Sequence, residues 1–154
     1  MGFEVVRSKK GIHLCQRKYA LLGMMANKSY LSPLSKNTKL LFILNAPLHD
    51  VESYRYPLYL INTQPAISFV VHLLSRFVQS PIVNHHQTNQ HVIRYIKFNP
   101  SQSLFFSSKT SVQLKDFNDF DWTSGSTTRR STTGYYIFLW NSLIYWKSKK
   151  QSTV

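Results

Sequence analysis

The period of the apolar residues changes near residue 100, and this change limits the fold more than any other feature of the sequence. Upstream, the apolar residues of 67–78 recur every three or four positions, which is typical of one face of a helix. Pro81 ends this segment, and a second helix is expected from about residue 84 to residue 97. From residue 103 onward, short apolar segments alternate with turns, as strands do. The pattern predicts an α+β chain with a mostly antiparallel sheet near its C-terminus.

The N-terminal part predicts a β-hairpin followed by a short helix. Residues 2–7 and 12–16 are the expected strands, with a glycine in the loop that joins them. Residues 17–25 hold alanine, leucine and methionine, which are good helix formers. Segment 27–47 is interrupted by proline, serine and asparagine and is expected to be a loop, and Pro57 should break a helix that begins before it.

Four extended segments are expected in the C-terminal part of the chain: 104–106, 112–120, 135–140 and 143–147. Segment 135–140 is apolar on both faces, as a central strand is. Asn141 and Ser142 are predicted to form the tight turn that follows it.

Charge is the strongest signal in the composition. Nineteen lysines and arginines stand against six aspartates and glutamates, which gives a net charge of +13. Such an excess attracts polyanions, so nucleic acid is the expected partner, with a merely basic surface as the alternative. Cys15 is the only cysteine, which excludes an intrachain disulfide. No apolar run approaches the roughly 20 residues of a membrane span, so no membrane association is expected.

Charged side chains of both signs gather after residue 114. On a strand, Asp119 and Asp121 would point to one face and Asp116 to the other. The candidate phosphate contacts are Arg129, Arg130, Lys147, Lys149 and Lys150. Solvation of the strand ends by these cations is an equally open interpretation. The neighbouring aromatic residues Trp122, Tyr135 and Tyr145 are expected to fill the core rather than to stack on bases.

The same stretch carries a longer pattern: D-x-D-W at 119–122, then T-R-R-S-T-T-G-Y, then Y-W-K-S-K-K-Q ending at residue 151. This pattern resembles the opening of the RNase H domain in the Pol polyproteins of copia-type LTR retrotransposons. The N-terminal stretch GFEVVRSKKGIHLCQRKYAL resembles the reverse transcriptase segment that follows the polymerase active site in that family. P-L-x-D at 47–50 and T-Q-P-A-I at 63–67 resemble weaker motifs of the family, the second without the Arg and Asp usual there.

The resemblance implies two parts. Residues 1–100 would be a helical remnant of the C-terminal, thumb- or connection-like region of the reverse transcriptase. Residues 103–154 would be the first three strands of a truncated, incomplete RNase H-like antiparallel sheet. Asp119 then matches the first catalytic aspartate, now vestigial, with Asp119 and Asp121 as weak metal ligands and Mg²⁺ as the cofactor that the family implies.

RNase H catalysis uses two Mg²⁺ ions held by several carboxylates from different elements. The sequence has neither the other family carboxylates nor the Y-x-D-D motif of the polymerase. The expectation is therefore a truncated and degenerate Pol fragment of plant origin without either activity, and an active nuclease is the least favoured interpretation.

Two further functions stay open from the sequence alone. One is a residual basic module that binds an RNA–DNA hybrid or a duplex without sequence preference. The other is an interaction protein that docks on an intact Pol protein. Self-association through the open edge of the C-terminal sheet is also expected, because unpaired strand edges attract other strands. The family suggests the cytoplasm or nucleus, with mitochondria as the alternative.

Overall fold

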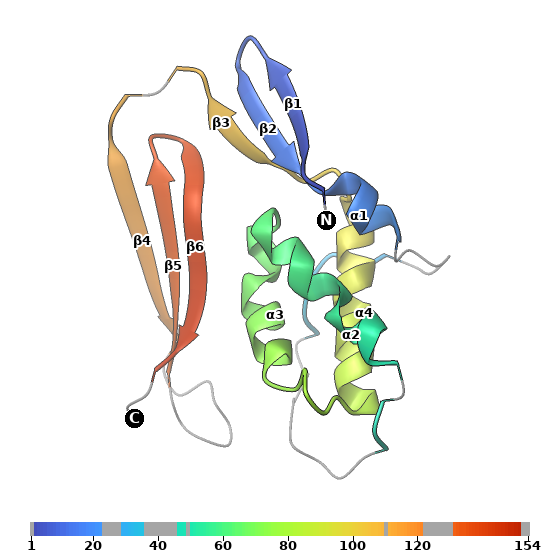
Figure 1. The fold of residues 1–154 in the computed structure, drawn as a ribbon. Helices are drawn as coiled ribbons and strands as arrows, with labels where there is room; N and C mark the ends of the chain where they lie inside the picture. Colours follow the sequence, from blue (N-terminus) through green and yellow to red (C-terminus); the bar gives the residue numbers. More distant parts are fainter. Residues whose placement is uncertain are drawn as a thin grey trace. The chain divides into compact units, whose positions relative to one another are not determined.

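The computed structural model describes residues 2–22, 29–35, 46–48, 50–109, 111–121 and 131–151 (Figure 1). The chain divides into two compact units. The helical unit contains Met1–Glu4 and Cys15–Ser103, and the sheet unit contains Val5–Leu14 and Leu104–Val154. The helices and the two small antiparallel sheets confirm the predicted α+β class.

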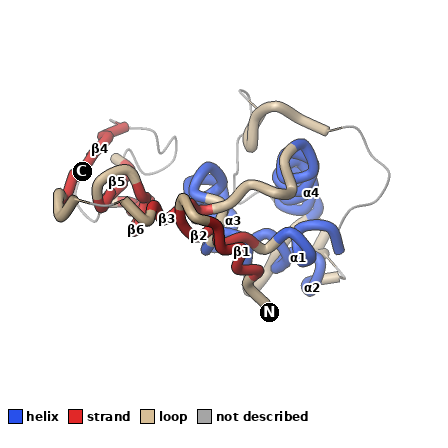
Figure 2. Tube along the Cα trace, turned by 90° about the horizontal axis from the view of Figure 1, so that it is seen from above, coloured by secondary structure: helices blue, strands red, loops and turns tan. Residues whose placement is uncertain are grey.

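The helical unit holds four α-helices and two 3₁₀ helices among its described residues. Figure 2 colours the helices of the chain blue. They are α1 (Arg17–Leu22), α2 (Val51–Arg55), η1 (Tyr56–Asn62), η2 (Pro65–Ile67), α3 (Ser68–Ser75) and α4 (Val83–Phe98). None of the described helices has the length and apolar character that a membrane crossing needs.

Pro57 and Pro65 lie in the first turns of the two 3₁₀ helices of this unit, whereas α3 ends at Ser75, before Pro81. α2 ends at Arg55, and the chain continues as a 3₁₀ helix with Pro57 in its first turn, where no backbone N–H is needed. The predicted helix over 67–78 begins with a 3₁₀ turn, becomes α3 and ends as an α-helix at Ser75. The second predicted helix matches α4 closely. In the loop predicted over 27–47, the described residues contain one isolated bridge, between Pro47 and Ile82.

The core of the helical unit is built on the apolar face predicted for 67–78. Ile67, Val70, Val71, Leu74 and Phe77 are buried there. The other buried members of the cluster are Ala20, Tyr54, Leu60, Val92 and Ile96, from α1, α2, η1 and α4. Burial of a large aliphatic side chain contributes about 1.5–3 kcal/mol, so this cluster is the main source of stability in the unit.

Buried polar side chains connect the helices of this core. The hydroxyl of Tyr54, a fully buried residue, donates to the Leu74 carbonyl oxygen at 2.8 Å. Thr63 Oγ1 donates to Gln16 Oε1 at 2.9 Å, which ties the residue after η1 to the residue before α1. These bonds satisfy groups that would otherwise be costly to bury.

The sheet unit contains two three-stranded sheets, ordered β1-β2-β3 and β4-β5-β6. The strands are β1 (Glu4–Ser8), β2 (Gly11–Cys15), β3 (Leu104–Ser107), β4 (Leu114–Asp121), β5 (Thr132–Leu139) and β6 (Ser142–Lys150). The predicted N-terminal hairpin is thus present, and β3 lies antiparallel to β2 with Gly11 opposite Ser107 (Figure 1). The C-terminal sheet is an antiparallel meander.

The turn between β5 and β6 differs from the prediction. It consists of Trp140 and Asn141, and Ser142 already belongs to β6. Trp140 has a φ of 56°, because tight two-residue hairpin turns require positive φ at one or both central positions. Ile144 is an extra residue between Leu143, which lies opposite Phe138, and Tyr145, which lies opposite Ile137, so β6 contains a bulge.

Gly11 is the position where the N-terminal sheet depends on glycine. Its φ is +150°, and a Cβ there would meet the Phe106 carbonyl oxygen and the Phe105 ring. Gly11→Ala should therefore lower the free energy of unfolding by about 1–3 kcal/mol, through backbone strain and this close contact. Urea unfolding followed by circular dichroism measures the change.

Gly134→Ala is the matched control, because a Cβ at Gly134 meets no heavy atom within 4 Å. This control should leave stability within about 1 kcal/mol of the unsubstituted chain. Equal effects of the two substitutions would contradict the role assigned to Gly11.

Tyr54→Phe removes the buried hydrogen bond to Leu74, and we expect it to lower the free energy of unfolding by about 1–2 kcal/mol. Burial raises the pKa of Tyr54, so above pH of about 10 the folded chain keeps a proton that the unfolded chain releases. The stability that the phenol contributes is present below that pH and is lost as the pH rises.

The free energy of unfolding of Tyr54→Phe should therefore differ less from that of the unsubstituted chain at pH 11 than at pH 8. Urea unfolding at the two pH values measures this difference. Tyr59→Phe is the control, because Tyr59 is 39% exposed. A difference that does not change with pH would contradict this account.

Candidate metal and nucleic-acid site

Asp119 lies at the β4 end of a cross-strand row of the C-terminal sheet. It is exposed on β4, opposite Gly134 of β5, and Gly134 is opposite Ser148 of β6. The unbroken register of β4 puts position 121 on the same face as Asp119 and Asp116 on the other. The side chain of Asp121 lies outside the described part of the chain.

The residues in this row do not fit a pair of magnesium ions. Mg²⁺ prefers octahedral oxygen ligands, and a two-metal site needs several carboxylates. The neighbours of Asp119 across the sheet are a glycine and a buried serine. Within the described ranges, no group of three histidine, cysteine, aspartate or glutamate side chains is placed to hold a metal ion.

The predicted cations of β6 lie on two faces of the sheet. Lys147 and Lys149 are exposed and share one face, opposite Tyr135 and Thr133 of β5. Lys150 is opposite Thr132, on the face that carries Asp119. The structure therefore brings Lys147 and Lys149 together and separates both from Lys150. Arg129 and Arg130 lie outside the described residues.

The aromatic residues near these lysines are less buried than the sequence suggests. Tyr145 is 46% exposed and stands on the face of Lys147 and Lys149, so the prediction that it fills the core is wrong. Tyr135, opposite Lys147, is half-buried. Trp122 lies outside the described residues. Tyr145 is exposed because both faces of this sheet are partly open, as the 57% exposure of Phe117 on the other face also shows.

Sequence reasoning passed over a second group of cations, at the tip of the N-terminal hairpin. Arg7, Lys9 and Lys10 are exposed there, and Lys109 lies close by because Ser108 hydrogen-bonds to the tip. The run R-S-K-K is a visible signal for the first three. No local pattern connects Lys109 to them.

Comparison with known proteins identifies the family of the chain. It is 32% identical to the Retrovirus-related Pol polyprotein from transposon RE1 of Arabidopsis thaliana, and 31% identical to that from transposon RE2 of the same plant. Each alignment covers 100% of this chain and 11% of the relative. An uncharacterized mitochondrial protein of Arabidopsis thaliana is 29% identical over 100% of this chain and 68% of its own length.

No protein-family model and no solved structure matches the chain. The alignments to the two Pol polyproteins cover the whole of this chain and confirm the resemblance that the motifs indicated. The chain spans only 11% of the length of those relatives. The chain belongs to the copia-type Pol polyproteins of retrotransposons.

Proposed function

We propose that this chain is the part of a Pol polyprotein in which the end of the reverse transcriptase, 1–100, continues into the first three strands of an RNase H domain, 103–154. The β4-β5-β6 meander supports this proposal most directly. It supplies three antiparallel strands in sequence order, and Asp119, which the resemblance matches to the first catalytic aspartate, lies on the first of them. The metal of such a domain would be Mg²⁺, bound by carboxylates additional to Asp119.

We further propose that the chain alone catalyses neither polymerisation nor cleavage. Its six carboxylates are Glu4, Asp50, Glu52, Asp116, Asp119 and Asp121. Glu4 Oε1 accepts a hydrogen bond from the Lys18 backbone N–H, and Asp50 caps α2 by accepting from the Ser53 N–H, so both have structural roles. Asp116 lies on the face opposite Asp119. The register puts position 121 on the face of Asp119, and two carboxylates of one strand hold a divalent cation weakly and fix no second one.

The test is cleavage of a labelled RNA–DNA hybrid in Mg²⁺ by the purified chain. We expect no cleavage above the buffer background and no difference between the unsubstituted chain and Asp119→Asn. A complete RNase H enzyme in the same buffer is the positive control. Mg²⁺-dependent cleavage that Asp119→Asn abolishes would contradict the proposal.

A second candidate function is a contact with nucleic acid that does not read sequence. The shared, exposed face of Lys147 and Lys149 on β6 favours it, with Tyr145 beside them as a platform for a base or ribose. Lysine attracts phosphate as a point charge, which gives affinity without sequence preference. Self-association through β4, an edge strand of the C-terminal sheet, stays a prediction of the sequence.

The double variant Lys147→Gln/Lys149→Gln tests this contact. The slope of log affinity against log salt on duplex DNA should become shallower by about 1.8, since each phosphate contact contributes about 0.9. Fluorescence anisotropy of a labelled duplex measures the slope. The control is Lys115→Gln/Lys150→Gln, which removes the same charge from the other face of the same sheet. Equal slopes for the two variants would contradict a contact through the face of Lys147 and Lys149.

A further inference from the structure

The tip of the N-terminal hairpin is joined to a segment that lies far away in the sequence. Ser108 donates twice to the tip: its N–H to the Lys10 carbonyl oxygen at 2.9 Å, and its Oγ to the Lys9 carbonyl oxygen at 3.0 Å, across 99 residues of sequence. Ser107 Oγ accepts from the Lys109 N–H at 3.2 Å and donates to the Lys109 carbonyl oxygen at 3.1 Å. Backbone and serine hydrogen bonds thus hold the backbones of Lys9, Lys10 and Lys109 close together.

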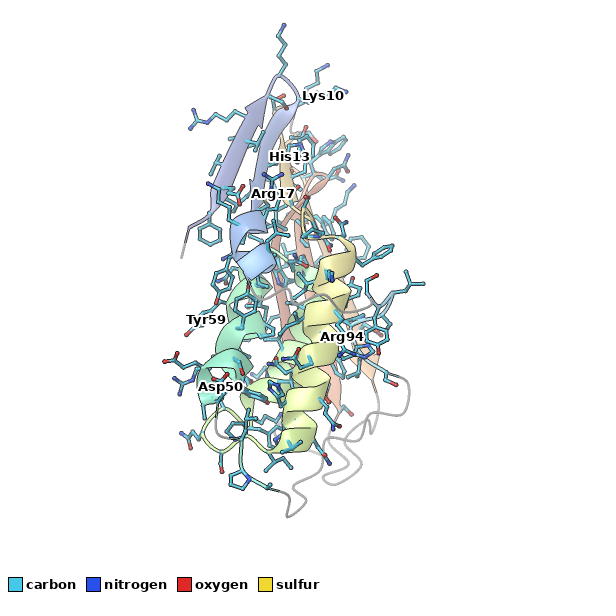
Figure 3. The ribbon with its side chains drawn as sticks, turned by 90° about the vertical axis from the view of Figure 1, so that its right-hand side faces the viewer. Lys10, His13, Arg17, Asp50, Tyr59 and Arg94 are labelled. Carbon is cyan, nitrogen blue, oxygen red and sulfur yellow. The ribbon has the colours of Figure 1, made fainter. Side chains whose placement is uncertain are left out.

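The turn itself is also held by local bonds. Ser8 Oγ donates to the Gly11 carbonyl oxygen at 3.1 Å and accepts from the Lys10 N–H at 3.3 Å. Gly11 follows directly, and its missing Cβ lets β2 approach the Phe106 carbonyl. The backbone of the tip is therefore fixed, although the lysine side chains extend into solvent, as Lys10 does in Figure 3.

The positive charge at this tip has no nearby carboxylate in its own sheet. Arg7, Lys9, Lys10 and Lys109 are all exposed. Among the residues of β1, β2 and β3, all of them described, Glu4 is the only carboxylate, and it lies 4.0 Å from the Arg17 side chain. Five residues of strand separate positions 4 and 9 by about 16 Å. This distance exceeds the screening length of about 8 Å at physiological salt.

We propose that Arg7, Lys9, Lys10 and Lys109 form one surface, the basic knob, that binds the phosphate backbone of nucleic acid without reading its sequence. The hydrogen bonds hold the backbone of the three lysines in place before a ligand binds. A ligand whose phosphates have a regular spacing then binds at a smaller cost in conformational entropy. A fluid layer of lipid headgroups gains nothing from that arrangement. The knob shares only its class of partner with the proposed contact through Lys147 and Lys149, and it uses none of the same residues.

The first experiment removes the charge of the knob in the full chain. Lys9→Gln/Lys10→Gln/Lys109→Gln should make the salt slope on duplex DNA shallower by about 2.7, that is, three contacts of about 0.9 each. Between 50 and 200 mM salt, this variant should lose roughly 40-fold less affinity than the unsubstituted chain, as the same slope implies. Fluorescence anisotropy measures both quantities.

The matched control is Lys18→Gln/Arg55→Gln/Lys97→Gln, which removes equal charge from α1, α2 and α4. Its slope should change by less than about 1. Equal slopes for the two triple variants would overturn the proposal, and so would a wild-type chain that does not bind duplex at 50 mM salt. The two proposals can also fail separately. A shallower salt slope for the knob variant, with an unchanged slope for Lys147→Gln/Lys149→Gln, would support the knob and contradict the contact through Lys147 and Lys149.

A second variant tests the arrangement rather than the charge. Ser107→Ala/Ser108→Ala keeps every lysine but removes the serine hydroxyls that hold Lys9 and Lys109. We expect duplex affinity to fall about 3- to 10-fold, with an unchanged circular dichroism spectrum. Unchanged affinity would overturn the role of the fixed tip. Binding to vesicles with 30% phosphatidylserine tests whether the knob prefers a lipid surface to nucleic acid. If Lys9→Gln/Lys10→Gln/Lys109→Gln loses vesicle binding but keeps duplex binding, the assignment to nucleic acid is overturned.

Discussion

The pairing of β2 with β3 is the interaction on which the N-terminal sheet depends. It joins Gly11–Leu14 to Leu104–Ser107, which lie far apart in the sequence. Bringing the two ends of the intervening segment together carries an entropic cost. Ladder hydrogen bonds and the burial of Leu104 offset that cost. Glycine at position 11 is what lets the two backbones approach. Without this pair, the N-terminal hairpin would have no third strand, and Lys109 would have no fixed place beside the hairpin tip.

The helical unit buries a neutral side chain at the second position of T-Q-P-A-I, 63–67, which resembles a family motif with an arginine there. Where the family has T-R-P-D-I, this chain has Gln64 and Ala66, and Gln64 is 2% exposed. An arginine buried at that position without the aspartate would leave a charge unpaired, which is strongly destabilising. A neutral amide avoids this cost. Its Oε1 lacks a hydrogen-bond partner within the described part of the chain, so some cost of burying this amide remains.

The C-terminal sheet separates two kinds of chemistry by the alternation of its strands. Asp119, Ser148 and Lys150 occupy one face, and Lys147 and Lys149 with Tyr145 occupy the other. A ligand that lies along the lysine face therefore does not touch the carboxylate that matches the nuclease motif. The proposed phosphate contact and the aspartate of the nuclease motif therefore use different faces of this sheet.

Local patterns in the sequence determined the α+β class, the buried face of 67–77 and the helix break at Pro57, because periodicity and proline act over a few residues. The motifs after Asp119 likewise determined the family. Only the tertiary structure decided that β3 pairs with β2, that Lys109 joins the hairpin tip, and that Lys150 shares the face of Asp119. These features depend on contacts between distant segments and on strand register, which no local pattern encodes.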